Sequence, residues 1–315
     1  MIDPQLFSPA SIAPATKALN EEIVAKLSAL PDPWSIPVED VRRRRREGLG
    51  PFPPLPKSDR ATSIEIKGPA GPISLRVIAP DAPKAVYLHI HGGGWTWGAP
   101  DEQDPDLERL AALGFACVSV RYRLAPEHPY PAAPDDCEAA ALWLVREGEK
   151  TFGTTFFTIG GESAGAHLAL VTMLRLRDRH GLTPFSGANL FAGCFDLAMS
   201  PSVRNWGSEK LILNTRDIGM FAQNFCGEHD RRDPDLSPIH ADLRDLPPAL
   251  ISIGTRDLLL DDSLFMASRW VAAGNACDLA IWPGGCHVFH RFDFPLAEEA
   301  LARIDAFFAG LTVRS

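Results

Sequence analysis

Short apolar runs of strand length alternate with longer helical patterns over most of the chain. The predicted buried strands have the sequences KAVYLHI, FACVSVRY, TFFTIGG, ANLFAGCF, ALISIGT and CDLAIW. Between them, helices are predicted near 107–113, 134–146 and 164–176, and a closing helix is predicted near 297–309. This alternation predicts an α/β fold, in which a mostly parallel sheet is flanked by helices.

Three segments depart from this alternation. Residues 1 to about 60 contain one helical pattern, at 16–30, followed by prolines and the run VRRRRREGLGPFPPLP. The second segment contains SIEIKG and ISLRVIAP, which alternate apolar with polar residues and predict a hairpin at a sheet edge. Between about 196 and 248 the alternation breaks down, which predicts an inserted helical cap.

Five consecutive arginines, at 42–46, stand out in the N-terminal segment. They could form a patch that binds a polyanion. Because the chain as a whole is acidic, we favour a solvated helical face with local ion pairs, and we assign these arginines no function.

Composition narrows the classes of function. A length of 315 residues allows one large α/β domain or two smaller ones, and we expect a single domain over 1–315. Hydrophobic residues make up 45% of the chain, but no apolar run approaches the roughly 18 residues of a membrane span. The net charge of −9 argues against a nucleic-acid partner and favours uncharged small-molecule substrates.

The six cysteines are scattered along the chain, without a C-x-x-C pair. We interpret them as mostly buried thiols in a reducing compartment. The first twenty residues lack the pattern of a secretory signal, so a cytoplasmic location is expected. No H-E-x-x-H, H-x-x-E-H or cysteine cluster occurs, so we expect neither a metal nor a cofactor.

The stretch TFFTIGGESAGAHLAL places Ser163 at a corner between a predicted strand and a predicted helix. A sharp corner requires small flanking residues, which Gly161 and Gly165 provide. The corner would lift the Ser163 hydroxyl clear of the backbone, as in a nucleophile elbow. The alternative is a small residue at a tight turn, because this short pattern also occurs by chance.

The strand KAVYLHI ends in HGGGWTWG, residues 91–98. Consecutive glycines are typical of a backbone that must turn sharply or pass close to a ligand or another segment. Their backbone N–H groups can then donate hydrogen bonds to a ligand. We expect an oxyanion hole built from this loop and the residue after the nucleophile. Its predicted members are Gly92, which lets the loop bend, and Gly93, Gly94 and Ala164. The alternatives are a flexible turn or a phosphate loop, and the latter lacks its diagnostic spacing.

Several motifs together carry a resemblance to a known family. In chain order they are HGGGW, YRLAPEHPYPAAPDD, GESAG, SPIHADLRDLPPALISIGTRDLLLDDS and GCH. They resemble the hormone-sensitive-lipase-like branch of the α/β-hydrolases, the bacterial family IV esterases, from about residue 80 onwards. The resemblance implies an eight-stranded, mostly parallel sheet with a helical cap formed by about 1–50 and about 197–240. It also implies serine-dependent hydrolysis of carboxylic esters with short acyl chains.

The same resemblance implies a catalytic triad of Ser163, Asp257 and His287. Asp257 and His287 each follow a predicted strand, in the chain order expected of the fold. Asp261 and Asp262 are alternatives for the acid, but they lie at the start of the next predicted helix, where capping or dipole roles suit them. His290 is the alternative base, but the family motif has its histidine at the earlier position, His287.

Other residues receive supporting roles. Trp95 and Trp97 wall the substrate pocket or pack under the cap. We expect Glu162 to be buried and hydrogen-bonded near the elbow, and His91 to shape the oxyanion loop. Glu127 and His128 are assigned to a hydrogen-bond network at the floor of the site.

The site predicts a serine carboxylesterase acting on a small-molecule ester. An amidase, a formamidase or a lactonase could use the same triad, since the fold does not select the leaving group. A non-catalytic small-molecule receptor is the alternative from another class, although all three triad members are present. Members of this branch often dimerise through an edge strand, which makes a homodimer an option here.

Overall fold

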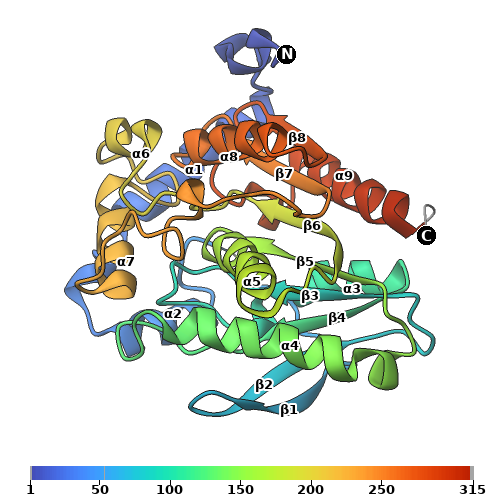
Figure 1. The fold of residues 1–315 in the computed structure, drawn as a ribbon. Coiled ribbons are helices and arrows are strands. Elements are labelled where there is room, and N and C mark those ends of the chain that lie inside the picture. The colour runs from blue at the N-terminus through green and yellow to red at the C-terminus, as the bar shows by residue number, and fades with distance from the viewer. Residues whose placement is uncertain (1, 53, 313–315) are drawn as a thin grey trace.

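The computed structural model describes residues 2–52 and 54–312, and its centre is one eight-stranded sheet (Figure 1). The strands lie in the order β1-β2-β4-β3-β5-β6-β7-β8. Their bounds are Thr62–Gly68 (β1), Gly71–Ile78 (β2), Ala85–Ile90 (β3), Phe115–Val120 (β4), Phe157–Glu162 (β5), Phe185–Phe191 (β6), Ala249–Gly254 (β7) and Cys277–Trp282 (β8). Only β2 pairs antiparallel with its neighbours, and all other pairs are parallel. The predicted fold class is confirmed.

Nine α-helices occur in the described part of the chain. Their bounds are Pro14–Ala29 (α1), Val38–Arg46 (α2), Asp104–Ala112 (α3), Ala132–Phe152 (α4), Ala164–His180 (α5), Pro201–Trp206 (α6), Thr215–Cys226 (α7), Leu260–Ala272 (α8) and Pro295–Thr312 (α9). The predicted helices all form. Three of them run further than the pattern indicated. α4 and α5 continue until Gly153 and Gly181 adopt the left-handed conformation that ends a helix, and α9 extends past its predicted bounds at both ends.

The helices cover both faces of the sheet. α4 and α5 pack side by side in front of it in the view of Figure 1. On the opposite face, the ring of Tyr87 in β3 contacts that of Phe308 in α9. Every residue of β3, β4, β5 and β7 is buried, which explains their continuous apolar sequences. The predicted edge hairpin is confirmed, with β1 and β2 paired antiparallel as far as Gly68 and Gly71.

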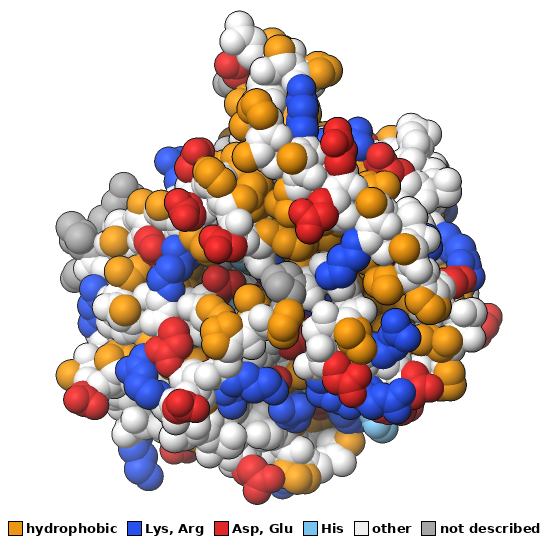
Figure 2. Space-filling model, turned by 180° about the vertical axis from the view of Figure 1, so that it is seen from behind, with side chains coloured by type: hydrophobic (Ala, Val, Ile, Leu, Met, Phe, Trp, Pro, Cys, Tyr) orange, Lys and Arg blue, Asp and Glu red, His pale blue; other side chains and the backbone are white. Residues whose placement is uncertain are grey.

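The N-terminal and mid-chain segments lie near one another beside the sheet (Figure 1). α1 and α2 come from the first segment, and α6 and α7 come from the stretch after β6. Side chains of both segments border one cavity, described below. The short helices η1 (Pro4–Phe7) and η2 (Pro9–Ser11) project from the body at the N-terminus, and on the face behind Figure 1 hydrophobic side chains gather below this projection (Figure 2).

The arginine run forms the C-terminal part of α2, but the expectation of a solvated face is wrong for two of its members. The Arg43 side chain is 58% exposed and pairs with Asp40, as expected of a local ion pair. In contrast, the side chains of Arg42 and Arg45 are only 12% and 14% exposed. Residues three apart share one face of a helix, and here that face is turned towards the body of the protein.

The six cysteines are free, as expected. Cys277 is half-buried, and the other five are buried. Within residues 2–52 and 54–312, no helix has both the length and the apolar character needed to cross a bilayer.

Candidate active site

Ser163 lies between β5 and α5 in a strained backbone conformation. Its φ of 57° and ψ of −122° fall in a backbone region that residues other than glycine rarely adopt. The flanking glycines are required because the end of β3 passes against this corner. A Cβ at Gly161 or Gly165 would lie 2.0 or 1.9 Å from the carbonyl oxygen of Ile90. The GESAG motif therefore forms a tight elbow that exposes the Ser163 hydroxyl.

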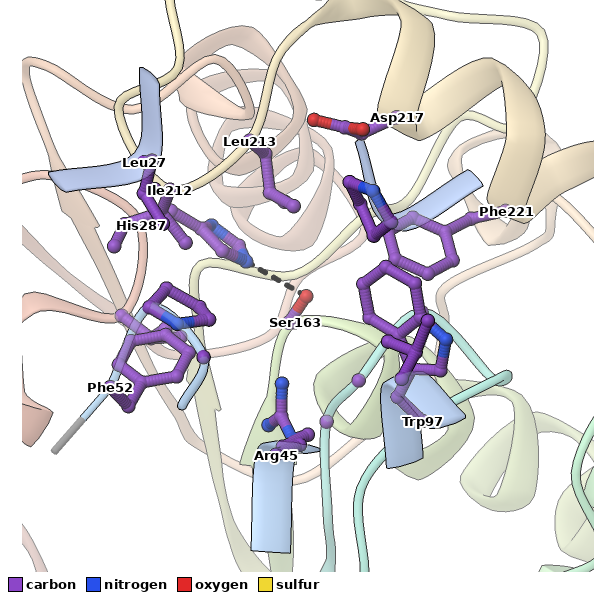
Figure 3. A pocket seen from close by; sticks show the side chains of 18 of the residues that line it. Leu27, Arg45, Phe52, Trp97, Ser163, Ile212, Leu213, Asp217, Phe221 and His287 are labelled. Carbon is purple, nitrogen blue, oxygen red and sulfur yellow. Dashed lines mark hydrogen bonds between the residues drawn. The ribbon is translucent and has the colours of Figure 1, made fainter. Parts of the chain in front are cut away.

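The structure brings Ser163, His287 and Asp257 together, and Figure 3 shows the contact between Ser163 and His287. The Ser163 Oγ lies 2.9 Å from His287 Nε2, and His287 Nδ1 lies 2.9 Å from Asp257 Oδ2. The other oxygen of Asp257 accepts a hydrogen bond from the backbone N–H of Leu259. His287 and Asp257 are buried, so this carboxylate is held in place and away from solvent. The arrangement allows the imidazole to accept the serine proton while the carboxylate orients the ring.

Three backbone N–H groups remain available around Ser163. Those of Gly93, Gly94 and Ala164 donate to no acceptor within the described residues. Gly93 and Gly94 have positive φ values of 116° and 58°, and a Cβ at Gly94 would lie 2.2 Å from the Phe221 ring. The N–H of Gly92 differs, because it donates to Glu162 Oε1 at 2.7 Å. Gly92 is therefore not a free donor, which restricts its predicted part in the oxyanion hole to the bend of the loop.

The Glu162 carboxylate holds the glycine loop through its hydrogen bond with the Gly92 N–H. Its Oε1 also accepts from Gln103 Nε2 at 2.7 Å, and its Oε2 lies 3.1 Å from His89 Nε2. Burial alone would raise the pKa of this carboxyl, but the His89 contact and the Gly92 N–H outweigh burial and lower the pKa to about 2. The predicted buried, hydrogen-bonded role of Glu162 agrees with this geometry.

His91 supports the same loop from its other side. Its Nδ1 donates to the carbonyl of Gly92 at 2.9 Å, and its ring stacks on Tyr122, whose hydroxyl donates to the His91 carbonyl. Burial lowers the pKa of His91 to about 4, so the ring is neutral near pH 7. The loop is thus held by hydrogen bonds at Gly92 and leaves the next two N–H groups free.

The two tryptophans of the loop differ in position. The Trp97 ring stacks on Trp34 and meets the edge of Phe221, and it lines the cavity beside Ser163 (Figure 3). Trp95 also borders the cavity, but its indole is buried, donates to His167 Nδ1 and stacks on Phe225. The pocket role therefore fits the Trp97 side chain, and packing fits that of Trp95.

A cavity of about 270 Å³ opens above Ser163 and His287. Its walls are mostly apolar, and they combine Leu27, Ile36, Val41 and Phe52 of the N-terminal segment with Ile212, Leu213 and Phe221 of the mid-chain segment. An apolar concavity with a few converging polar groups is typical of a small-molecule site. In the parts of the chain that the structure describes, no group of three His, Cys, Asp or Glu side chains is placed to hold a metal ion.

The alternatives for acid and base lie elsewhere. His290 is buried against Phe191, outside hydrogen-bond distance of Ser163, and its Nε2 is 3.8 Å from an Asp106 oxygen. Asp261 and Asp262 do occupy the first turn of α8, but neither caps it.

Asp262 instead accepts hydrogen bonds from the loop after β6, at Phe195 N, Asp196 N and Ser200 Oγ. Glu127 does take part in a hydrogen-bond network, as predicted, although Glu127 and His128 are both exposed. Glu127 binds Arg42 of α2 through both of its oxygens.

Arg45 and Arg291, whose side chains line the cavity, were not predicted as site residues. Arg45 pairs with Glu102 at 2.7 Å and belongs to a helical arginine run that we expected to be solvated. The 42/45 spacing on one helical face was the available signal for Arg45. No motif marked Arg291, because its position at the cavity depends on how the chain folds after His287.

Family comparison agrees with this geometry. A model described as the α/β-hydrolase fold matches residues 87–291, which contain the elbow, the glycine loop and the strand ends that carry Asp257 and His287. The chain belongs to the α/β-hydrolase family. The predicted resemblance to the hormone-sensitive-lipase-like branch is confirmed by the relatives and solved structures that this hydrolase matches.

Among curated proteins, this α/β-hydrolase is 35% identical to Esterase LipI of Mycobacterium tuberculosis over 82% of its own chain and 83% of that protein. It is 33% identical to an acetyl-hydrolase of Streptomyces hygroscopicus, over 72% of this chain and 75% of that one. Among solved structures, it superimposes on a hormone-sensitive lipase from a metagenome library with a TM-score of 0.82 and 28% identity, covering 94% of this chain and 98% of the other. An esterase from Pyrobaculum calidifontis gives a TM-score of 0.82 at 29% identity, covering 96% and 99%.

Proposed function

We propose that this protein is a serine carboxylesterase that hydrolyses short-chain esters through an acyl-enzyme intermediate. The observation that carries the proposal is the continuous pair of 2.9 Å contacts from Ser163 Oγ to His287 and from His287 to Asp257. The curated relatives named esterase and acetyl-hydrolase support the same class of reaction.

In the first half of the reaction, His287 Nε2 takes the Ser163 proton as Oγ attacks the ester carbonyl carbon. Asp257 accepts from His287 Nδ1–H and stabilises the imidazolium. The tetrahedral intermediate then collapses, its C–O bond to the alcohol breaks, and His287 returns the proton to the alcohol oxygen. The products of this half are a free alcohol and an acyl group on Ser163.

In the second half, His287 removes a proton from a water molecule as the water oxygen attacks the acyl carbon. The bond from that carbon to Ser163 Oγ breaks, and Oγ regains its proton. In both halves the N–H groups of Gly93, Gly94 and Ala164 donate to the carbonyl oxygen as it becomes negative. Donors of this kind are each worth about 2.7–4 kcal/mol in a hydrolase.

The preference for short chains is supported by the size of the cavity. Pockets for small molecules commonly span about 300–1,000 Å³, and the cavity here is about 270 Å³. We propose that the protein is a single domain over 1–315 and that about 1–50 and about 197–240 form its cap. Side chains of both segments line the cavity above Ser163, which supports this proposal. A cytoplasmic location, the absence of a nucleic-acid partner and a homodimer stay predictions.

Hydrolysis of p-nitrophenyl acetate by the wild type and by Ser163→Ala tests this function. We expect turnover in the wild type and its loss in the variant, with the thermal unfolding of the two proteins closely matched. Substantial turnover by folded Ser163→Ala would refute the proposal. Parallel assays with a lactone and an anilide separate an esterase from a lactonase or an amidase.

A further inference from the structure

The cavity above Ser163 has an excess of positive side chains, although the chain carries a net charge of −9. Its charged lining consists of Arg44, Arg45, Lys210, Arg216 and Arg291 on the positive side and Asp32, Glu162 and Asp217 on the negative side. All three carboxylates already accept hydrogen bonds from the protein. Positive side chains thus outnumber negative ones in this lining, and the excess of positive charge favours an anionic ligand.

Two of these guanidinium groups meet at Phe52. The Cζ atom of Arg45 lies 5.6 Å from the centre of the Phe52 ring, and that of Arg291 lies 4.4 Å from it. The side chains are 14% and 6% exposed, so both charges are largely removed from solvent. Figure 3 shows Arg45 below Ser163, with its guanidinium group directed into the cavity.

The nearest carboxylate, Glu102, serves the two arginines unequally. Its Oε2 lies 2.7 Å from Arg45 but 3.7 Å from Arg291 Nη1, while Arg291 Nη2 donates to the Glu102 backbone carbonyl. Burial lowers the pKa of Arg291, and the nearby charge of Arg45 acts in the same direction.

The Nε atom of Arg291 is buried without a hydrogen-bond partner within the described residues. A buried donor on a charged group is costly when it is left without an acceptor. Arg291 Nε therefore lacks an acceptor beside Arg45 in the described chain, and a carboxylate of a ligand could supply it.

We propose that the cavity takes an ester that also carries a free carboxylate, and that Arg45 and Arg291 bind this carboxylate. A planar guanidinium group matches a carboxylate with two parallel hydrogen bonds. The apolar walls, such as Leu213 and Phe221, contact the hydrocarbon part of the substrate. Net charge led us to expect uncharged substrates, but it describes the whole surface, whereas binding depends on the few charges that line the cavity.

This inference rests on the proposed esterase function, and matched ester pairs test it. One pair carries the charge in the acyl part: p-nitrophenyl hydrogen glutarate and p-nitrophenyl valerate have acyl chains of similar length. The other pair carries it in the alcohol part: 4-acetoxybenzoate and 4-methylphenyl acetate. We expect kcat/KM to favour the charged ester by about 10-fold in at least one pair, and that pair identifies which part of the substrate reaches the arginines. No preference in either pair would overturn the proposal.

Two variants remove the proposed carboxylate ligands one at a time, and a third is the control. In Arg45→Gln and Arg291→Gln, the ratio of kcat/KM between charged and neutral ester should fall by about 10-fold, chiefly through a higher KM for the charged ester. The ratio does not depend on the fraction of protein that is folded. Arg43→Gln, an exposed change on the same helix, should keep the wild-type ratio. An unchanged ratio in both Arg45→Gln and Arg291→Gln would overturn the proposal.

The same assays separate failure of this site from failure of the esterase function. If Ser163→Ala still hydrolyses p-nitrophenyl valerate, the esterase proposal falls, and the carboxylate site falls with it. If valerate hydrolysis requires Ser163 but the charged ester is not preferred, only the carboxylate site falls.

Discussion

Replacing Glu162 tests how the oxyanion loop is held. In Glu162→Ala, the N–H of Gly92 and the side-chain amide of Gln103 stay buried and lose the acceptor that each now has at 2.7 Å. A buried donor left unpaired costs about 1–3 kcal/mol. Two such donors lead us to expect a fall of about 2–6 kcal/mol in the free energy of unfolding.

The pKa of Glu162 gives a second measure of the same contacts. It lies at about 2, against an ordinary value of 4.5. This difference corresponds to about 3 kcal/mol. Because the folded pKa lies below the unfolded one, this stabilisation is complete above about pH 4.5 and is lost as the pH falls towards 2. Glu162→Gln has no charge to lose, so its stability should approach that of the wild type over this range.

Urea unfolding at pH 7 and p-nitrophenyl acetate turnover measure the two consequences. Without its anchor at Gly92, the loop should misplace its free N–H groups and kcat should fall by about 10- to 100-fold. Glu65→Ala removes an exposed carboxylate from β1 and should change unfolding by less than about 0.5 kcal/mol. Glu162→Ala with wild-type stability and wild-type kcat would refute this account of the loop.

Three further changes test the surroundings of the site. Gly165→Ala places a Cβ 1.9 Å from the Ile90 oxygen and should prevent stable folding. The control Gly153→Ala, with φ of 75° but no atom within 4 Å of the added Cβ, should lower the free energy of unfolding by only about 1–2 kcal/mol in thermal unfolding. Equal losses of stability in the two variants would contradict the close approach at Gly165. Burial lowers the pKa of His290 from 6.5 to about 3, so the unfolded chain takes up a proton below about pH 6.5 that the folded chain excludes. His290→Leu should therefore lose less stability than the wild type between pH 7 and pH 5 in urea titrations, and parallel losses would contradict this. Asp257→Asn should lower kcat on p-nitrophenyl acetate by about four orders of magnitude because the imidazole takes the wrong tautomer; a loss below 10-fold would exclude Asp257 as the orienting acid.

The strands and the elbow could be predicted because local sequence encodes them. β5 is buried along its whole length, and its apolar run shows this directly. The conformation of Ser163 requires small neighbours, and the glycines around it are visible in the sequence. The meeting of Asp257 and His287 could be predicted because both follow neighbouring parallel strands, β7 and β8, whose carboxyl ends share one edge of the sheet.

The contacts of the charged side chains could not be predicted in the same way. Helical spacing shows that Arg42 and Arg45 share a face, but their partners Glu127 and Glu102 lie 85 and 57 residues away in sequence. Asp262 was likewise assigned to its own helix, although the backbone groups it binds are 66 and 67 residues away. Local patterns give an element its faces, whereas the packing of distant segments decides which groups cover them.

The most direct test of the catalytic site is the covalent product of the wild type with a p-nitrophenyl phosphonate. We expect one adduct per chain, located by peptide mass spectrometry on Ser163, and a crystal structure of that adduct with the phosphonyl oxygen against the N–H groups of Gly93, Gly94 and Ala164. An adduct on another residue, or an active enzyme that forms none, would contradict the account.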